Sequence, residues 1–113
     1  MVTQQASQQT ADVFHAVSDV TRRAILDRLR EGAKPVNEIA RAFPVSRPAI
    51  SKHLRVLHDA RLVMEHREGR HRLYRLNPAP LRDLDRWLAN YREFWAVSLS
   101  NLKRHVEERE KKK

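Results

Sequence analysis

The chain has 113 residues, of which 41% are hydrophobic, so its length suits one small domain with a modest core. Its 23 Lys and Arg residues outnumber the 14 Asp and Glu residues, and the net charge of +9 indicates a polyanionic partner such as nucleic acid or an anionic membrane. The lack of cysteine excludes disulfides and thiolate metal sites. No apolar run could span a bilayer, and the N-terminus lacks the pattern of a secretion signal, so we expect a cytoplasmic protein.

Three short helices are predicted in the first part of the chain, after about eight polar residues that we expect to be frayed. Apolar residues recur there at helical spacing, and the segments that carry them span residues 9–17, 21–32 and 36–43. The side chain of Asp19 or Thr21 can cap the second helix, which Gly32 stops. Pro44 ends the third helix, because the residue before a proline disfavours helical backbone.

A fourth helix is predicted over residues 47–60, and its two faces differ in chemistry. Ser46 is a good N-cap residue, and Pro48 is tolerated in the first turn. The predicted core face follows the spacing i, i+4, i+7 and consists of Ile50, Leu54 and Leu57. The predicted outer side carries Pro48, Lys52, Arg55 and Asp59, flanked by Ala49 and Ser51. Such a helix is either an ordinary solvated surface helix or one that lies in a nucleic-acid groove.

A β-hairpin is predicted over residues 61–77, where apolar and polar residues alternate on both sides of Glu68 and Gly69. If these two residues form the turn, Arg67 faces Arg70 across the strands. Like charges directly opposite each other destabilise a hairpin, whereas phosphate binding would offset their repulsion. The basic hairpin is therefore a second candidate contact with nucleic acid, and the alternative is a solvent-exposed turn.

A long final helix is predicted over residues 79–107, with Asn77 as its N-cap and Pro78 as its first residue. Its apolar residues recur three or four apart, at Leu81, Leu84, Leu88, Tyr91, Trp95, Leu99, Leu102 and Val106. Residues 108–113 are expected to form a charged, disordered tail. The whole chain, residues 1–113, is thus expected to be one domain that ends in a long helix.

The apolar stripe of the final helix is predicted to be the seam of a dimer. Trp87 and Phe94 make the stripe too wide for one of the small helices to cover. We expect the first helix to accompany it with Val13, Phe14 and Val17. The predicted interface residues are Phe14, Leu84, Leu88, Tyr91, Trp95, Leu99 and Leu102. A pocket for an unidentified small-molecule effector among these aromatic side chains stays open as an alternative.

Four helices, a hairpin and a final helix make a mainly α, winged helix-turn-helix module of about five helices with a two-stranded β-hairpin wing. The stretches "VSDVTRRAILDRLREG", "VNEIARAFPVSRPAISKHLRVLHDARLV" and "EGRHRLYRLNP" resemble the ArsR-type family of bacterial winged-helix regulators and cover most of residues 14–78. The stretch "YREFWAVSLSNLKRHVEE" in the final helix resembles a metal-independent subgroup of this family. Val20 departs from the resemblance, because the family usually has proline there.

The resemblance implies a homodimeric repressor that binds an inverted repeat in double-stranded DNA, often at its own promoter. In the family, the start and outer face of the fourth helix contact the groove, which points here to Arg47, Ser51 and Lys52, with Arg55 next along. An arginine at the start of such a helix can donate two hydrogen bonds to a guanine edge, whereas the later cations suit phosphates. The hairpin arginines suit the minor groove or flanking phosphates. The predicted DNA-binding residues are Ser46, Arg47, Ser51, Lys52, Arg55, Arg67, Arg70 and Arg72.

The histidines are not predicted to bind metal, and we expect no cofactor. His66 and His71 could oppose each other across the hairpin, but only Glu68 is near enough to be a further ligand. His105 begins a His-x-x-Glu pair that resembles half of the zinc site in metal-sensing relatives, but Ala96 stands where their earlier histidine is needed. His53 lies beside the core face of the fourth helix, and we expect it to pack against the hairpin or the third helix.

Two other classes of function stay open beside the sequence-specific repressor. The charge alone would permit a non-specific nucleoid or architectural DNA-binding protein. A winged helix could also bind protein or RNA as an interaction module. An enzyme is not predicted, because the sequence has no catalytic triad pattern, paired carboxylates, phosphate loop or metal cluster at useful spacing.

Overall fold

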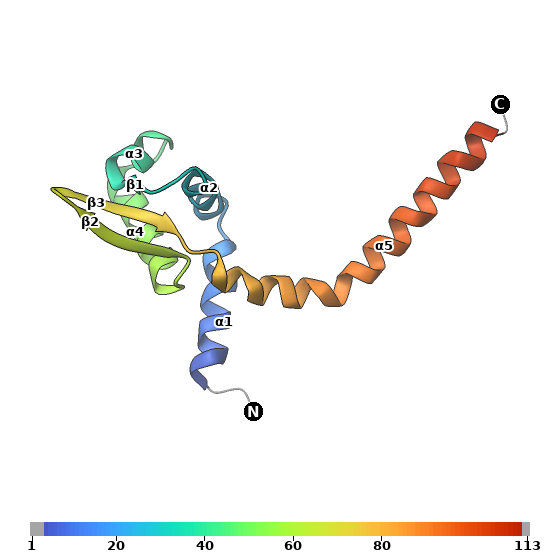
Figure 1. Ribbon diagram of the computed structural model, residues 1–113, viewed down its shortest axis with the longest axis horizontal. Coiled ribbons are helices and arrows are strands. Elements are labelled where there is room, and N and C mark those ends of the chain that lie inside the picture. The colour runs from blue at the N-terminus through green and yellow to red at the C-terminus, as the bar shows by residue number, and fades with distance from the viewer. Residues whose placement is uncertain (1–3, 112–113) are drawn as a thin grey trace. The chain divides into compact units, whose positions relative to one another are not determined.

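The computed structural model describes residues 4–111 and has the element order of a winged helix-turn-helix (Figure 1). The elements are α1 Gln4–Val17, α2 Val20–Leu29, β1 Lys34–Pro35, α3 Val36–Arg41, α4 Arg47–Asp59, β2 Val63–Glu68, β3 His71–Leu76, the 3-10 turn η1 Ala79–Leu81 and α5 Arg82–Lys111. The chain divides into a compact unit that extends to Asp83 and a second unit that begins at Leu84 and contains the rest of α5. The predicted mainly α fold with five helices is confirmed.

The core of the compact unit lies between the helices and the base of the hairpin. The predicted inner face of α4 is confirmed, since Ile50, Leu54 and Leu57 are each no more than 1% exposed. They are joined in the core by Val13, Ala16, Ile25, Leu26, Leu29, Ile39, Ala60, Leu62 and Val63. This burial fixes α4 from one side and leaves its opposite side open.

Helix α1 begins at Gln4 rather than near residue 9, so the expectation of a frayed start was wrong for residues 4–8. Two side chains of this first part explain the difference. Gln8 donates a hydrogen bond to Asp12 one turn on, at 2.9 Å, and Gln9 donates to the carbonyl oxygen of Ala60 at 2.8 Å. The second bond ties the helix to the end of α4.

Helix α2 is capped by Asp19 and not by Thr21. The Asp19 carboxylate accepts a hydrogen bond from the backbone N–H of Arg22 at 3.0 Å, which satisfies one of the free N–H groups of the first turn. This bond, with the positive charge of Arg22 nearby, lowers the pKa of the Asp19 carboxyl from its ordinary value of 3.8. Asp19 is therefore ionised over the whole neutral range.

Val20→Pro is expected to stabilise the fold. Val20 is the first residue of α2 and its side chain is 69% exposed, while Asp19 before it has the extended backbone that a following proline requires. A proline there costs no helical hydrogen bond and restricts the unfolded chain, so the free energy of unfolding should rise by about 0.4–1 kcal/mol. Urea denaturation measures it, with Val20→Ala as the control for removal of the valine side chain. A fall in stability for the proline variant alone would contradict the prediction.

The turn of the hairpin lies one residue later than predicted. The register pairs Glu68 with His71, so the turn residues are Gly69 and Arg70 and not Glu68 and Gly69. Gly69 has a φ of +64°, a conformation that favours glycine, and it takes the first central position, as in a type II′ turn. The need for a positive φ at that position sets the register.

This shift changes which side chains oppose each other. Arg67 faces Arg72 and not the turn residue Arg70, so the hairpin still pairs two like charges. His66 faces Leu73, and the idea of two opposing histidines was therefore wrong. The hairpin is also not the whole sheet, because β1 pairs with β3 in the order β1-β3-β2. Strand β1 was not predicted, because it is only two residues long and ends in a proline.

The segment after the hairpin differs from prediction at both ends of the final helix. Asn77 does not cap a helix, because its side-chain amide donates to the carbonyl oxygen of Arg61 at 2.7 Å and a 3-10 turn follows. At the other end α5 continues to Lys111, so the tail expected from residue 108 is helical as far as the structure describes it. Residues 112–113 lie outside the described residues. Between residues 4 and 111, no helix has both the length and the apolar character that crossing a membrane requires.

Candidate nucleic-acid interface

The outer face of α4 presents the predicted side chains to solvent. Ser46 is the N-cap, as predicted, and its hydroxyl accepts a hydrogen bond from the backbone N–H of Ala49 at 3.3 Å. The exposed residues on the outer face are Arg47, Ser51, Lys52 and Arg55. Because the inner face of α4 is buried along its length, these side chains are held at fixed spacing by the core behind them.

A hollow of about 370 Å³ brings the start of α4 together with the hairpin. Arg47 and Ser51 of α4 line it on one side, and Arg70 and Arg72 of the hairpin line it on the other. Its remaining lining residues are Pro35, Val36, Asn37, His71 and Tyr74. Two separate stretches of the sequence therefore form one basic surface, which we call the α4–wing face.

A second hollow, of about 280 Å³, extends this face along α4. It is lined by Ser51, Leu54, Arg55, His58, Glu65, Arg72 and Tyr74. Ser51, Arg72 and Tyr74 line both hollows. Of the predicted DNA-binding residues, Ser46, Lys52 and Arg67 line neither hollow, so they lie outside the part that the structure brings together.

Glu65 is a component of this face that the sequence analysis missed. Its carboxylate lies 3.1 Å from Nε of Arg72, across the two strands of the hairpin. This contact orients Arg72 and partly neutralises its charge, and the terminal Nη groups of Arg72 remain as donors. Burial, together with the charge of Glu65 and a hydrogen bond to it, raises the pKa of the neighbouring Tyr74 above its ordinary value of 10. Only the hairpin register, which pairs Glu65 with Tyr74, could have revealed this arrangement.

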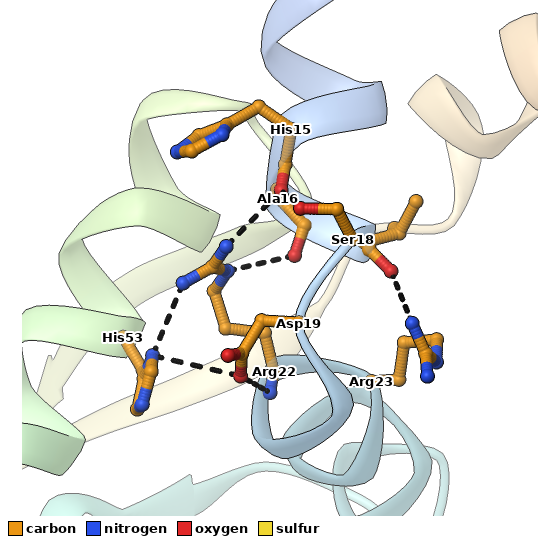
Figure 2. Close-up of polar contacts among 8 residues, drawn as sticks. His15, Ala16, Ser18, Asp19, Arg22, Arg23 and His53 are labelled. Atoms are coloured by element: carbon orange, nitrogen blue, oxygen red, sulfur yellow. Dashed lines mark hydrogen bonds and ion pairs between the residues drawn. The ribbon is translucent and has the colours of Figure 1, made fainter.

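His53 is packed, as expected, but against a different element. The polar contacts of its ring are with Asp19 and Arg22 at the start of α2, neither of which was predicted as a partner (Figure 2). Its ring is thus turned away from the outer face of α4, and it does not belong to the α4–wing face.

The histidines and acidic residues do not gather into a metal-binding cluster in the part of the chain that the structure describes. Across residues 4–111, no group of three or more His, Asp or Glu side chains is placed so that it could hold a metal ion.

Helix α5 carries a continuous apolar surface of its own. The structure describes every residue of α5, and none of them is buried. Trp87, Tyr91 and Phe94 form a row, with ring centroids 5.2 Å apart in the first pair and 6.4 Å in the second. Trp95 is 50% exposed, and the stripe continues through Leu99, Leu102 and Val106. A single helix of about 45 Å with this stripe needs a partner to cover it.

The residues expected from the first helix differ in their exposure. Val13 is 0% exposed and belongs to the core of the compact unit, so its assignment to a dimer seam was wrong. Phe14 and Val17 are half-buried. They keep surface that a partner could cover.

Comparisons with known proteins agree with this geometry. Residues 19–65 match the family described as bacterial regulatory protein, arsR family. The chain is 48% identical over 91 residues to the HTH-type transcriptional regulator Rv2034 of Mycobacterium tuberculosis, covering 77% of this chain and 78% of that protein. It is 42% identical over 80 residues to the transcriptional repressor SdpR of Bacillus subtilis, covering 71% and 89%.

Solved structures give the same result for the fold. The crystal structure of an ArsR family transcriptional regulator has a TM-score of 0.70 at 33% identity and covers 85% of this chain and 97% of its own. The solution structure of a homodimeric winged helix-turn-helix DNA-binding domain from Mycobacterium bovis has a TM-score of 0.63 at 29% identity and covers 80% and 88%. The predicted winged-helix architecture is thus found in proteins of related sequence.

Proposed function

Because this chain belongs to the ArsR family of bacterial regulatory proteins, we propose that it is a homodimeric transcriptional repressor that binds an inverted-repeat operator in double-stranded DNA. The observation that carries the proposal is the α4–wing face, where arginines from α4 and the hairpin surround one hollow. A relative is named a transcriptional repressor, which favours repression over activation. The protein would act in the cytoplasm, and its own promoter is the first operator to examine.

The chemistry of each side chain suggests its role on DNA. Arg47 stands in the first turn of α4, where a guanidinium can reach the O6 and N7 acceptors of a guanine. Ser51, one turn on, can reach a base or a phosphate. Lys52 and Arg55 are assigned to phosphates, which position the helix without specifying sequence. The N-terminus of α4, which Ser46 caps, carries partial positive charge and would attract a phosphate.

The hairpin would contact the backbone or the minor groove. Arg70 is exposed at the turn, and Arg67 and Arg72 follow on opposite strands. Because Glu65 already pairs with Arg72, we assign the free charge of the hairpin mainly to Arg67 and Arg70. The proposed DNA-binding set remains Ser46, Arg47, Ser51, Lys52, Arg55, Arg67, Arg70 and Arg72.

The dimer is proposed to form through the apolar stripe of α5. A symmetric dimer presents the same patch from both copies, so a continuous stripe is suited to cover itself. The proposed seam consists of Leu84, Leu88, Tyr91, Trp95, Leu99 and Leu102, with Phe14 from α1. Two-fold symmetry would place two α4 helices on two half-sites, about 34 Å or one helical turn apart. An inverted repeat is the DNA sequence with the matching symmetry.

Selection of DNA from a random duplex pool tests the proposal. We expect the purified chain to enrich an inverted repeat with half-sites one helical turn apart, bound at least about 10³-fold more tightly than random DNA. Affinity should fall steeply with salt, because phosphate contacts release counterions. Equal binding of selected and random duplexes would indicate a nucleoid protein instead. A flat salt dependence would indicate an interaction module for protein or RNA. The DNA upstream of its own gene, tested in parallel, decides on autoregulation.

A further inference from the structure

Arg22 is a buried cation that joins the end of α1 to the start of α2. Its side chain is 9% exposed. Nε donates to the carbonyl oxygen of Ala16 at 2.7 Å, and Nη2 donates to that of His15 at 3.1 Å (Figure 2). Both carbonyls belong to the last turn of α1, where the helix supplies no further N–H four residues on. That of His15 also accepts from the backbone N–H and the hydroxyl of Ser18. The guanidinium is therefore held in place by two backbone carbonyls, independently of its contacts with other side chains.

The same guanidinium reaches α4 through His53. Nη1 of Arg22 lies 3.3 Å from Nδ1 of His53. His53 lies in the middle of α4, the helix that carries the proposed base-contacting residues. An arginine only donates hydrogen bonds, so the contact is a hydrogen bond only if Nδ1 carries a lone pair. The ring must then be neutral, with its proton on Nε2. Asp19, the cap of α2, lies beside this pair, with its Oδ2 4.0 Å from Nδ1.

We propose that His53 is a positioning residue, which in its neutral form fixes α4 against the junction of α1 and α2 and so sets where Arg47 and Ser51 meet the DNA. The inference rests on the proposed function. The buried stripe of Ile50, Leu54 and Leu57 packs α4 against the core through apolar contacts, which are not directional. The bond from Arg22 is directional and lies off that stripe, so it adds a restraint on small rotations of α4 about its axis.

Protonation of His53 would break this contact. A charged imidazole has no lone pair, and its Nδ1–H would face the guanidinium of Arg22. The charged groups around the ring are Arg22 from α2 and Asp19 from the preceding turn, while α1 contributes backbone carbonyls through Arg22. Because the pKa of Asp19 is lowered, its carboxylate stays ionised when a histidine becomes charged. The ring would therefore turn from Arg22 toward Asp19, and the contact that sets the position of α4 would be exchanged for a different one.

The variant His53→Asn separates the hydrogen bond from the proton. Its side-chain oxygen can accept from Arg22 near the position of Nδ1, but it does not titrate. We expect the ratio of wild-type to variant affinity for the selected operator to fall about two- to tenfold between pH 8 and pH 5.5. The same ratio on random DNA should stay constant. The other five histidines are present in both proteins, so their effects cancel.

The exposed His15 provides the matched control, because it contributes only its backbone carbonyl to the cluster. His15→Asn should keep the wild-type pH profile. A wild type and a His53→Asn variant with parallel pH profiles on the operator would overturn the inference. Absence of selective binding at every pH would instead overturn the proposed function, and this inference with it.

A second measurement does not need DNA. Nitrogen NMR of the histidine rings of the full chain should show His53 at pH 8 with Nδ1 unprotonated and Nε2 protonated, and the signal should be missing in His53→Asn. A ring with its proton on Nδ1 at pH 8 would exclude the bond from Arg22 and overturn the inference. If His53→Asn does not fold, as judged by circular dichroism, the tautomer in the wild type decides.

Discussion

Trp95→Glu is expected to abolish the dimer at micromolar protein concentration. Trp95 lies in the apolar stripe of α5 and is half exposed in the single chain, so a partner would have to cover it. In a symmetric dimer the substitution occurs twice, and each copy would bury a carboxylate among Tyr91, Leu99 and their counterparts. Burying an unpaired charge costs several kcal/mol, enough to weaken association by several orders of magnitude. Sedimentation should show monomer or unfolded chain where the wild type is dimeric.

The control places the same charge on the opposite side of the same helix. Ser100 is exposed and lies five residues from Trp95, about 140° around an α-helix from it. Ser100→Glu should therefore remain dimeric and bind operator like the wild type. A wild type that stays a folded monomer at micromolar concentration would contradict the proposed seam, and so would a Trp95→Glu variant that remains dimeric.

Local signals were sufficient to predict the helices of the compact unit. The cap at Ser46 and the spacing of Ile50, Leu54 and Leu57 act within one or two turns, so they can be read without knowledge of the fold. The end of α2 was predicted less well, since the helix stops at Leu29 and not at Gly32. The outer face of α4 follows from its inner face by geometry. The prediction of a recognition helix therefore needed only one periodic segment and its neighbours.

Contacts between distant segments were not predictable in the same way. The turn at Gly69 and Arg70 depends on which residue takes the positive φ, and a shift of one residue replaces every opposing pair. Glu65 joins the α4–wing face only in the observed register. Asn77 could cap a helix by sequence, yet its amide is used by the carbonyl of Arg61, sixteen residues away.

His53 shows the same limit within the helix that was predicted best. Its angle on α4 placed it correctly beside the core face. Its partner was not predictable, because Arg22 is a cation and would ordinarily be assigned to the surface. The carbonyls of His15 and Ala16 at the end of α1, together with His53, give that cation the hydrogen-bond partners that make its burial favourable.

Arg47→Ala is expected to cost about 1–3 kcal/mol per half-site on the selected operator and much less on random DNA. Arg47 is exposed at the start of α4, where base edges of the major groove can be reached. Arg47→Lys is the sharper variant, because it keeps the charge but cannot make the paired hydrogen bonds of a guanidinium. It should abolish most of the operator preference while binding random DNA like the wild type.

Arg70→Ala should behave in the opposite way, because Arg70 sits at the turn of the hairpin, where only backbone or minor groove is within reach. We expect it to weaken operator and random duplexes by similar factors and to lower the salt slope by about one for each phosphate that the variant no longer neutralises. Titration of both duplexes over several salt concentrations measures both variants together. Equal weakening of both duplexes by Arg47→Ala would mean that α4 does not read bases at that position. An Arg70→Ala variant that binds both duplexes like the wild type would mean that the turn does not touch DNA, and Arg67 would then be the hairpin cation to test next.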